Sequence, residues 1–284
     1  MTARGFGLEE QWTRGGEESV TDKAVLASVS SQGIATITLN RPQVHNAFDD
    51  RLIAELTAEI ARLDQQREVR VVVLAASGKS FSAGADLNWM KRMSGYSEAE
   101  NLRDAVGLAN LMHTLAGLSK PSVAGVQGAA FGGGVGLVAC CDVAVAAEEA
   151  TFSLSEVRLG LIPSAISPYV IRAIGHRAAQ RYFLTAERFA AREALRIGLV
   201  HEVVAQEKLD DTVARICAEL LQGGPQALAA AKRLVADVSD ARLDHSLVEE
   251  TARRIAAIRV SPEGREGIAA FLEKRKPRWM SGEE

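Results

Sequence analysis

Three short segments carry the residues with which this chain could do chemistry. Two are turns rich in small residues, at 81–87 (FSAGADL) and 128–137 (GAAFGGGVGL), and the second has five glycines in ten positions. Small residues let a ligand approach the backbone, and exposed N–H groups at the start of a helix favour negative charge. Two such turns can direct two amides at one oxygen atom, which is the arrangement of an oxyanion hole.

The third segment, at 152–160 (FSLSEVRLG), places the carboxylate of Glu156 among apolar neighbours. Apolar surroundings raise the pKa of a carboxyl group, which makes it a better proton carrier near neutral pH. Glu156 is therefore a candidate general acid–base. The alternative is an exposed ion pair with Arg158, which is the commoner arrangement for a glutamate close to an arginine.

Other site types fit the chain poorly. After Gly134 there is no Lys-Ser/Thr pair, so the phosphate-loop motif fails, and the GGGVG spacing does not match the dinucleotide fingerprint. The five histidines are scattered, and a net charge of −3 gives no basic surface for nucleic acid. We expect no metal, no resident cofactor, no nucleic-acid partner and no membrane span. The three cysteines predict buried free thiols and a cytoplasmic location.

The elements that must position these segments alternate between strands and helices. Residues 24–40 predict a β-hairpin around Gly33, and 70–76, 122–126 and 142–147 predict further strands. Asp49 is placed to cap a helix whose apolar residues fall on one stripe. That stripe comprises Leu52, Ile53, Leu56, Ile60 and Leu63. The alternation predicts an α/β domain.

Three regions follow from this pattern. We predict a disordered tail at 1–23, a catalytic core at 24–204 and a helical oligomerisation region at 205–284. The last region has helix starts at Gly224-Pro225 and Ser261-Pro262. Its apolar residues exceed what isolated helices should expose, so we expect them to pack on a neighbouring subunit. They are Ile255, Ile258, Ile268, Phe271 and Leu272.

Taken together, FSAGADL, GAAFGGGVGL and FSLSEVRLGLIP resemble the enoyl-CoA hydratase/isomerase (crotonase) superfamily. The resemblance extends from about Val25 to FLEKRKPRW at 271–279 and includes LNRP, NAF and LTAERF. It implies an α/β fold with a crotonase-like ββα spiral core and a C-terminal all-helical trimerisation region. It also implies a homo-oligomer, either a trimer or a dimer of trimers, and an acyl-CoA thioester substrate that brings coenzyme A with it.

The resemblance further assigns roles to residues. The amides of Ala85 and Gly133 would bind the thioester oxygen, and Glu156 would be the acid–base. Asp86 and Asp142 match family positions too, and we expect both to satisfy helix or turn amides. The positions implied for contact with substrate or coenzyme A, the last two sometimes from a neighbouring subunit, are Val44, His45, Ala47, Ala83, Asp86, Leu87, Gly132, Phe271 and Lys274.

The chain departs from the family pattern at two places. Many hydratases of the family hold a water between two glutamates, and the first of these falls at Gly136 here. The second departure is the run IPSAIS at 162–167, where many relatives have glycines, so we expect an altered acyl pocket. Ser155, Ser153 or a distal carboxylate of the substrate could replace the missing contact to water.

The combination of GGGVGL, CCD, LSEVRLGLIP, ISPYV and RYFLTAERF is most similar to the methylglutaconyl-CoA hydratases of leucine catabolism and their bacterial relatives. We therefore expect hydration of 3-methylglutaconyl-CoA or a related branched enoyl-CoA. Cations available for a distal carboxylate are Arg158, Lys91, Arg92 and His45. A Δ3-Δ2 enoyl-CoA isomerase needs the same oxyanion hole and one glutamate, so it remains the alternative. A third hypothesis is that the protein binds acyl-CoA without catalysing a reaction.

Overall fold

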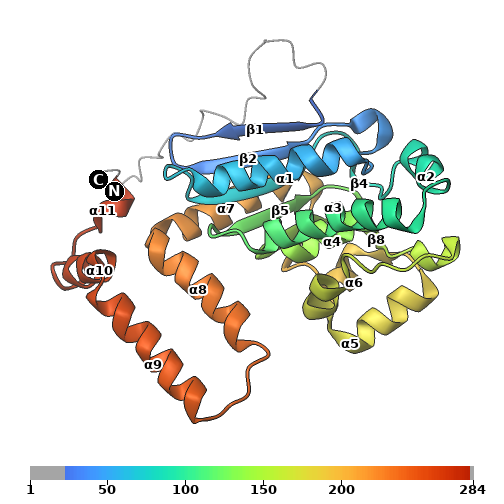
Figure 1. The fold of residues 1–284 in the computed structure, drawn as a ribbon. Coiled ribbons are helices and arrows are strands. Elements are labelled where there is room, and N and C mark those ends of the chain that lie inside the picture. Colours follow the sequence, from blue (N-terminus) through green and yellow to red (C-terminus); the bar gives the residue numbers. More distant parts are fainter. Residues whose placement is uncertain (1–22, 282–284) are drawn as a thin grey trace.

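The computed structural model describes residues 23–281 (Figure 1). Of the predicted N-terminal tail at 1–23, only Lys23 lies within the described residues. Two sheets and their covering helices occupy the chain as far as Val204, and helices follow from there on. The α/β class and the C-terminal helices predicted from the sequence are thus confirmed.

The larger sheet has the strand order β1-β2-β3-β5-β7-β10. Strands β1 (Val25–Val29) and β2 (Ile34–Leu39) form the predicted antiparallel hairpin, with Gly33 at φ +82° in its turn. The other neighbouring pairs are parallel. Their strands are β3 (Val71–Ala76), β5 (Ser122–Val126), β7 (Val143–Ala147) and β10 (Glu202–Val204).

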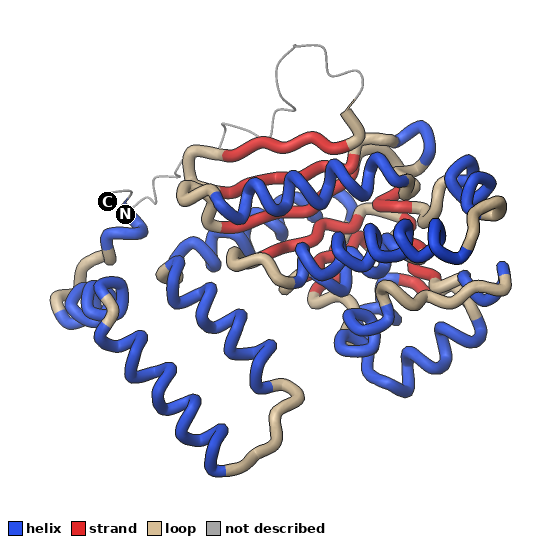
Figure 2. The backbone as a smooth tube through the Cα atoms, viewed as in Figure 1, coloured by secondary structure: helices blue, strands red, loops and turns tan. Residues whose placement is uncertain are grey.

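Helices bury both faces of this sheet (Figure 2). Val71 and Val73 of β3 pack in one cluster with Val213 of α7 (Leu209–Gln222). Val72 belongs to the other cluster, which contains the buried stripe of α1 (Asp50–Gln65). Because successive side chains of a strand point to opposite faces, a strand covered on both sides must be apolar throughout. This explains the continuous apolar run at 71–76.

Helix α1 begins where the sequence predicts. The Asp49 side chain accepts a hydrogen bond from Leu52 N at 2.8 Å, which satisfies an amide that the helix itself leaves unpaired. All five predicted apolar residues of its stripe are buried. Together with α3 (Glu98–Ala116), α1 covers the face of the sheet that looks toward the reader in Figure 1.

The smaller sheet has the order β4-β6-β8-β9. The sequence did not predict these strands, because two or three residues are too few to show a period of two. Their bounds are β4 (Ser80–Ser82), β6 (Ala129–Phe131), β8 (Thr151–Ser153) and β9 (Phe189–Ala190). Strands β4, β6 and β8 run parallel, and each overlaps the beginning of one of the three segments that carry chemistry. Parallel neighbours end at the same edge, so this sheet brings the three segments together.

Shorter helices complete the core. Those that follow the small strands are α2 (Leu87–Met93), α4 (Gly133–Cys140) and the 3-10 helix η2 (Glu156–Leu159). Two others, α5 (Ser167–Thr185) and α6 (Ala191–Arg196), close the core on the side of the smaller sheet. The 3-10 helices η1 (Pro42–Val44) and η3 (Gln206–Lys208) are single turns.

Beyond α7, the helices α8 (Pro225–Val238), α9 (His245–Val260), α10 (Pro262–Leu272) and α11 (Arg278–Ser281) form a C-terminal arm. Figure 1 shows α8 to α10 projecting from the sheets. The predicted cap of α10 is present, because Gly264 N donates to Ser261 Oγ at 3.0 Å. Among the described residues, no helix is long and apolar enough to cross a membrane.

Candidate active site

The two glycine-bearing turns lie side by side at the end of the smaller sheet. Residues 83–86 connect β4 to α2, and Gly132 connects β6 to α4. Gly132 has φ +50° and ψ −116°, and Gly84 has φ +91°, so both positions adopt backbone that side chains disfavour. A Cβ atom built on Gly132 would lie 4.0 Å from the Cα of Gly84. The turns approach this closely because neither residue has a side chain.

Glu156 extends its carboxyl group over this pair of turns. The same Cβ position on Gly132 would lie 3.1 Å from Glu156 Oε1. Glu156 Oε2 is buried and accepts no hydrogen bond from any described residue. An unpaired buried acceptor is costly, and in native proteins it commonly marks a place where a ligand, an ion or water binds.

The surroundings of Glu156 change its acidity. Burial is the largest cause and raises the pKa of its carboxyl group, while a hydrogen bond from its own backbone opposes the shift. No ion pair joins Glu156 to Arg158 within the part of the chain that the structure describes, and Arg158 itself is exposed. The surface-pair alternative for Glu156 is therefore not what the structure contains.

Two backbone amides beside the carboxyl group have no acceptor. Among residues 23–281, neither Ala85 N nor Gly133 N donates a hydrogen bond. Gly133 is the first residue of α4, where the N–H groups of a helix are free. Ala85 is exposed and Gly133 half-buried, so a ligand atom can reach both. An oxygen atom that developed negative charge between them would be stabilised.

Phe48 contacts both turns and so fixes the position of the two amides relative to each other. Its N–H donates to Gly84 O at 2.7 Å, and its carbonyl accepts from Asp86 N at 2.8 Å, so it brackets Ala85. Its ring packs beneath the second turn, since a Cβ on Gly133 would lie 3.1 Å from Phe48 Cε2. Sequence reasoning gave Phe48 no role. The available signal was a large apolar residue inside a loop, directly before the helix cap.

Asp86 stabilises the first turn. Its side chain accepts from Asn88 N and Trp89 N at 2.8 and 3.3 Å, which caps α2. Its other oxygen lies 3.2 Å from the Arg41 guanidinium, which also binds Asp49 at 2.7 Å. Asp86 therefore satisfies helix amides, as expected.

Asp142 is satisfied in a similar way. Its carboxylate accepts from Ser122 N at 2.7 Å and pairs with Lys232 Nζ at 2.8 Å.

Apart from Gly132 and Asp86, described above, the predicted substrate and coenzyme A positions fall into two groups. Val44, Ala47, Ala83 and Leu87 lie on or beside the first turn, and Leu87 is 81% exposed. His45 is also there, and its Nδ1 lies 3.1 Å from Ser80 Oγ.

Phe271 and Lys274 lie at the end of α10 and just after it. Figure 1 places α10 at the opposite end of the molecule from α2. A single chain therefore does not bring these two residues to the site.

The side chains predicted to bind a distal carboxylate differ in whether they already form an ion pair and in how exposed they are. Arg92 pairs with Asp50 on α1. Lys91 and Arg158 are exposed. Arg158 lies on η2, two residues after Glu156, and is thus the candidate on the same element as the acid–base.

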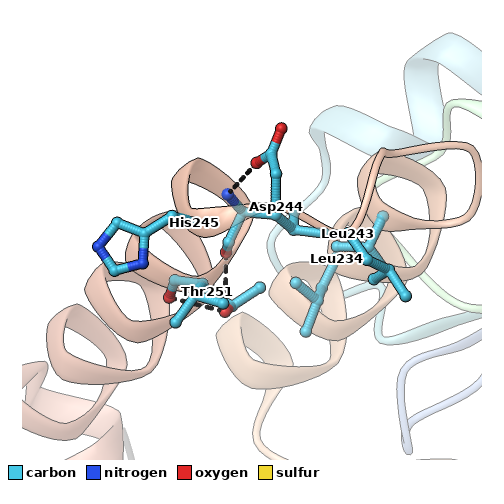
Figure 3. Close-up of a pocket in the computed structure, with 8 residues that line it drawn as sticks. Leu234, Leu243, Asp244, His245 and Thr251 are labelled. Atoms are coloured by element: carbon cyan, nitrogen blue, oxygen red, sulfur yellow. Dashed lines mark hydrogen bonds between the residues drawn. The ribbon is translucent and has the colours of Figure 1, made fainter.

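A groove of about 630 Å³ lies between α8 and α9 in the C-terminal arm (Figure 3). Leu234, Leu243 and Val248 are among its mainly apolar lining residues. None of the predicted site residues lines it. We therefore assign the chemistry to the edge of the smaller sheet and not to this groove. Within residues 23–281, no cluster of histidine, cysteine and carboxylate side chains suits a metal ion.

The chain is similar in sequence and fold to known proteins. The family model described as "Enoyl-CoA hydratase/isomerase" matches residues 29–282. The 2,3-dehydroadipyl-CoA hydratase of Escherichia coli is 33% identical over 248 residues, which cover 87% of this chain and 94% of that protein. An enoyl-CoA hydratase from Shewanella pealeana has a crystal structure that matches with a TM-score of 0.88 at 45% identity, covering 90% of this chain and 96% of that one.

A second crystal structure, of enoyl-CoA hydratase from Mycobacterium smegmatis, matches with a TM-score of 0.85 at 34% identity and covers 91% of this chain and 99% of that one. These matches span nearly all of both chains. The chain therefore belongs to the enoyl-CoA hydratase/isomerase family of enzymes and has its crotonase fold.

Proposed function

We propose that this protein adds water across the 2,3 double bond of an enoyl-CoA, with Glu156 as its single acid–base. The observation that carries the proposal is the position of the Glu156 carboxyl group. It lies against Gly132, one residue from the Gly133 amide, and its Oε2 accepts no hydrogen bond from the described residues. A proton carrier and two free amides thus meet at one point.

The reaction would run in two proton transfers. The Ala85 and Gly133 amides bind the thioester oxygen, which withdraws electrons from the double bond and makes C3 electrophilic. Glu156 takes a proton from water as the water oxygen bonds to C3, and then gives a proton to C2 of the enolate. Removing one donor from an oxyanion hole typically raises the barrier by about 2.7–4 kcal/mol.

Ser153 and Ser155 are the two side chains that could bind the attacking water in place of the missing glutamate. Ser153 is buried, and its hydroxyl lies 3.5 Å from Ala186 O. Ser155 is half-buried and directly precedes Glu156. These surroundings favour Ser155, or a polar group of the substrate itself.

For the acyl group we propose 3-methylglutaconyl-CoA or a related branched enoyl-CoA. The combination of motifs supports a branched acyl chain, and one relative is by name a 2,3-dehydroadipyl-CoA hydratase. Arg158 and Lys91 are exposed cations that a distal carboxylate could approach. The coenzyme A part would lie along residues 44–47 and 83–87.

We also propose that the chain forms a trimer, or a dimer of trimers, through residues 205–284. The support is the exposure of large apolar side chains on the arm, a pattern that monomers rarely maintain. Val248 is 62% exposed, Ile255 49% and Phe271 82%. In such an assembly Phe271 and Lys274 would be free to approach a neighbouring active site. Light scattering of the purified protein measures the subunit number.

Three free, buried cysteines support a cytoplasmic location.

The test is a parallel ultraviolet assay of purified protein with 3-methylglutaconyl-CoA and crotonyl-CoA, following loss of the enoyl-thioester absorbance. We expect turnover of the branched diacid and a loss of at least about 10²-fold in kcat for Glu156→Gln. Glu149→Gln is the matched control, because Glu149 is exposed on the turn before β8. Near-full activity of Glu156→Gln would refute the mechanism. Turnover of a 3-enoyl-CoA without hydration would identify the Δ3-Δ2 isomerase instead, and binding without turnover an acyl-CoA-binding protein.

A further inference from the structure

Gly136 is a buried glycine in the interior of α4, where glycine weakens a helix by roughly 1 kcal/mol relative to alanine. The structure contains a reason for it. A Cβ atom built there would lie 2.3 Å from Ile166 Cγ2, 2.9 Å from Ile166 Cβ and 3.1 Å from Met112 Sδ. Ile166 is 2% exposed and Met112 fully buried. The space that a side chain at 136 would need is therefore already filled by two apolar groups.

This filled space lies close to the acid–base. Gly136 N donates to Gly132 O at 3.2 Å, so Gly132, the cap of α4, lies one helical turn before Gly136. Gly132 is the residue against which the Glu156 carboxyl group lies. Ile166 ends the segment that leads from η2 to α5, and those two helices pack on each other. The Ile166 side chain thus lies against α4 at Gly136, and Ile166 begins the helix that packs on η2.

We propose that Ile166, backed by Met112, is a positioning residue that closes the Gly136 side of the reaction chamber to water and to any polar side chain. Glu156 then meets water only from the substrate side, and no second carboxylate can enter from α4. The inference rests on the proposed single-glutamate mechanism and gives a role to the two sequence departures, Gly136 and the run at 162–167. They are two halves of one packing arrangement.

The charged and titratable groups around Glu156 do not account for the raised pKa of its carboxyl group. Its own helix carries Arg158, which is exposed, and the adjacent first turn carries Asp86, which is engaged with Arg41 and the start of α2. On α5, burial is the largest cause that raises the pKa of Tyr169; Cys140 of α4 raises it further, and Arg172 opposes the shift. None of them contributes to the raised pKa of Glu156, whose cause is burial. A change in that burial should therefore be visible in the pH dependence of the reaction.

The experiment compares Ile166→Ala with Ile166→Val. Alanine removes Cγ2 and leaves room for a water molecule beside the unpaired carboxyl oxygen. Valine keeps both γ-carbons and therefore continues to exclude water from this side. Water at that place stabilises the charged carboxylate, so the pKa of the base falls. We expect the acidic limb of the kcat/KM profile to move to lower pH by roughly 0.5–1 unit in Ile166→Ala. In Ile166→Val the limb should stay where the unmodified enzyme has it.

Met112→Ala opens the same space from α3 and guards against an alanine variant at 166 that does not fold. We expect its limb to move in the same direction. A folded Ile166→Ala or Met112→Ala enzyme with an unshifted limb would overturn the inference, because the residue would then only fill volume. That result leaves the proposed function intact if Glu156→Gln is inactive. Full activity of Glu156→Gln would instead remove the proposed function itself.

Discussion

Replacing Gly132 with alanine should separate backbone strain from catalysis. Gly132 has φ +50° and ψ −116°, a region that alanine enters only under strain. Holding a side chain in such backbone costs about 1–3 kcal/mol, so we expect Gly132→Ala to lose that amount of unfolding free energy. For a chain of this size, each kcal/mol lowers Tm by roughly 2–4 °C. Differential scanning calorimetry measures this part of the effect.

The catalytic part comes from one contact. The new methyl group would lie 3.1 Å from Glu156 Oε1, which is tighter than ordinary packing, so the carboxyl group must move by a few tenths of an ångström. A misplacement of 1 Å can cost about 10²-fold in rate. We therefore expect roughly a tenfold loss of kcat, equivalent to about 1.4 kcal/mol in the barrier. KM should change less than kcat, because the positions implied for coenzyme A, apart from Gly132 itself, lie on other segments.

Gly175→Ala is the matched control. Gly175 kinks α5 with φ +74° and ψ 161°, which is equally unfavourable for alanine, yet a Cβ there meets nothing within 4 Å. Both variants should lose similar stability, while Gly175→Ala keeps kcat within about twofold. If Gly132→Ala also keeps its kcat, the position of the carboxyl group against Gly132 is unimportant and the reasoning fails.

Three further predictions concern a buried carboxyl group, a paired arginine and a buried thiol. Burial raises the folded-state pKa of Glu156, so the folded protein holds that proton more tightly and loses stability as pH rises from the ordinary glutamate pKa to the raised one. Glu156→Gln should therefore be more stable than the unmodified protein at pH 7, by about 1 kcal/mol, and show no such advantage near pH 4 in denaturant titrations. Arg41→Lys should cost about 2 kcal/mol of stability by calorimetry, since lysine cannot bind Asp49 and Asp86 together, and an unchanged Tm would contradict this. Burial raises the pKa of the Cys141 thiol to about 12, so mass spectrometry should find it unmodified by iodoacetamide at pH 8 until the protein is unfolded.

The sequence by itself determined those features that depend on neighbours along the chain. The apolar stripe of α1 and its Asp49 cap are local patterns, because residues three and four apart share a face of a helix. The uninterrupted apolar run of β3 likewise indicated a strand covered on both faces. Motif order and spacing were sufficient to identify the family and to select Ala85, Gly133 and Glu156 as candidates.

Only the tertiary structure decided how these candidates meet. Strands β4, β6 and β8 are too short to leave a periodic signal, and they exist because each is paired with a strand about twenty to fifty residues away. Phe48 brackets Ala85 and supports Gly133 through contacts that no local pattern encodes. In the same way, the absence of a side chain at Gly136 has a physical reason thirty residues later, in Ile166. Close packing across large sequence separations fixes such pairs, and it becomes visible only once the chain has folded.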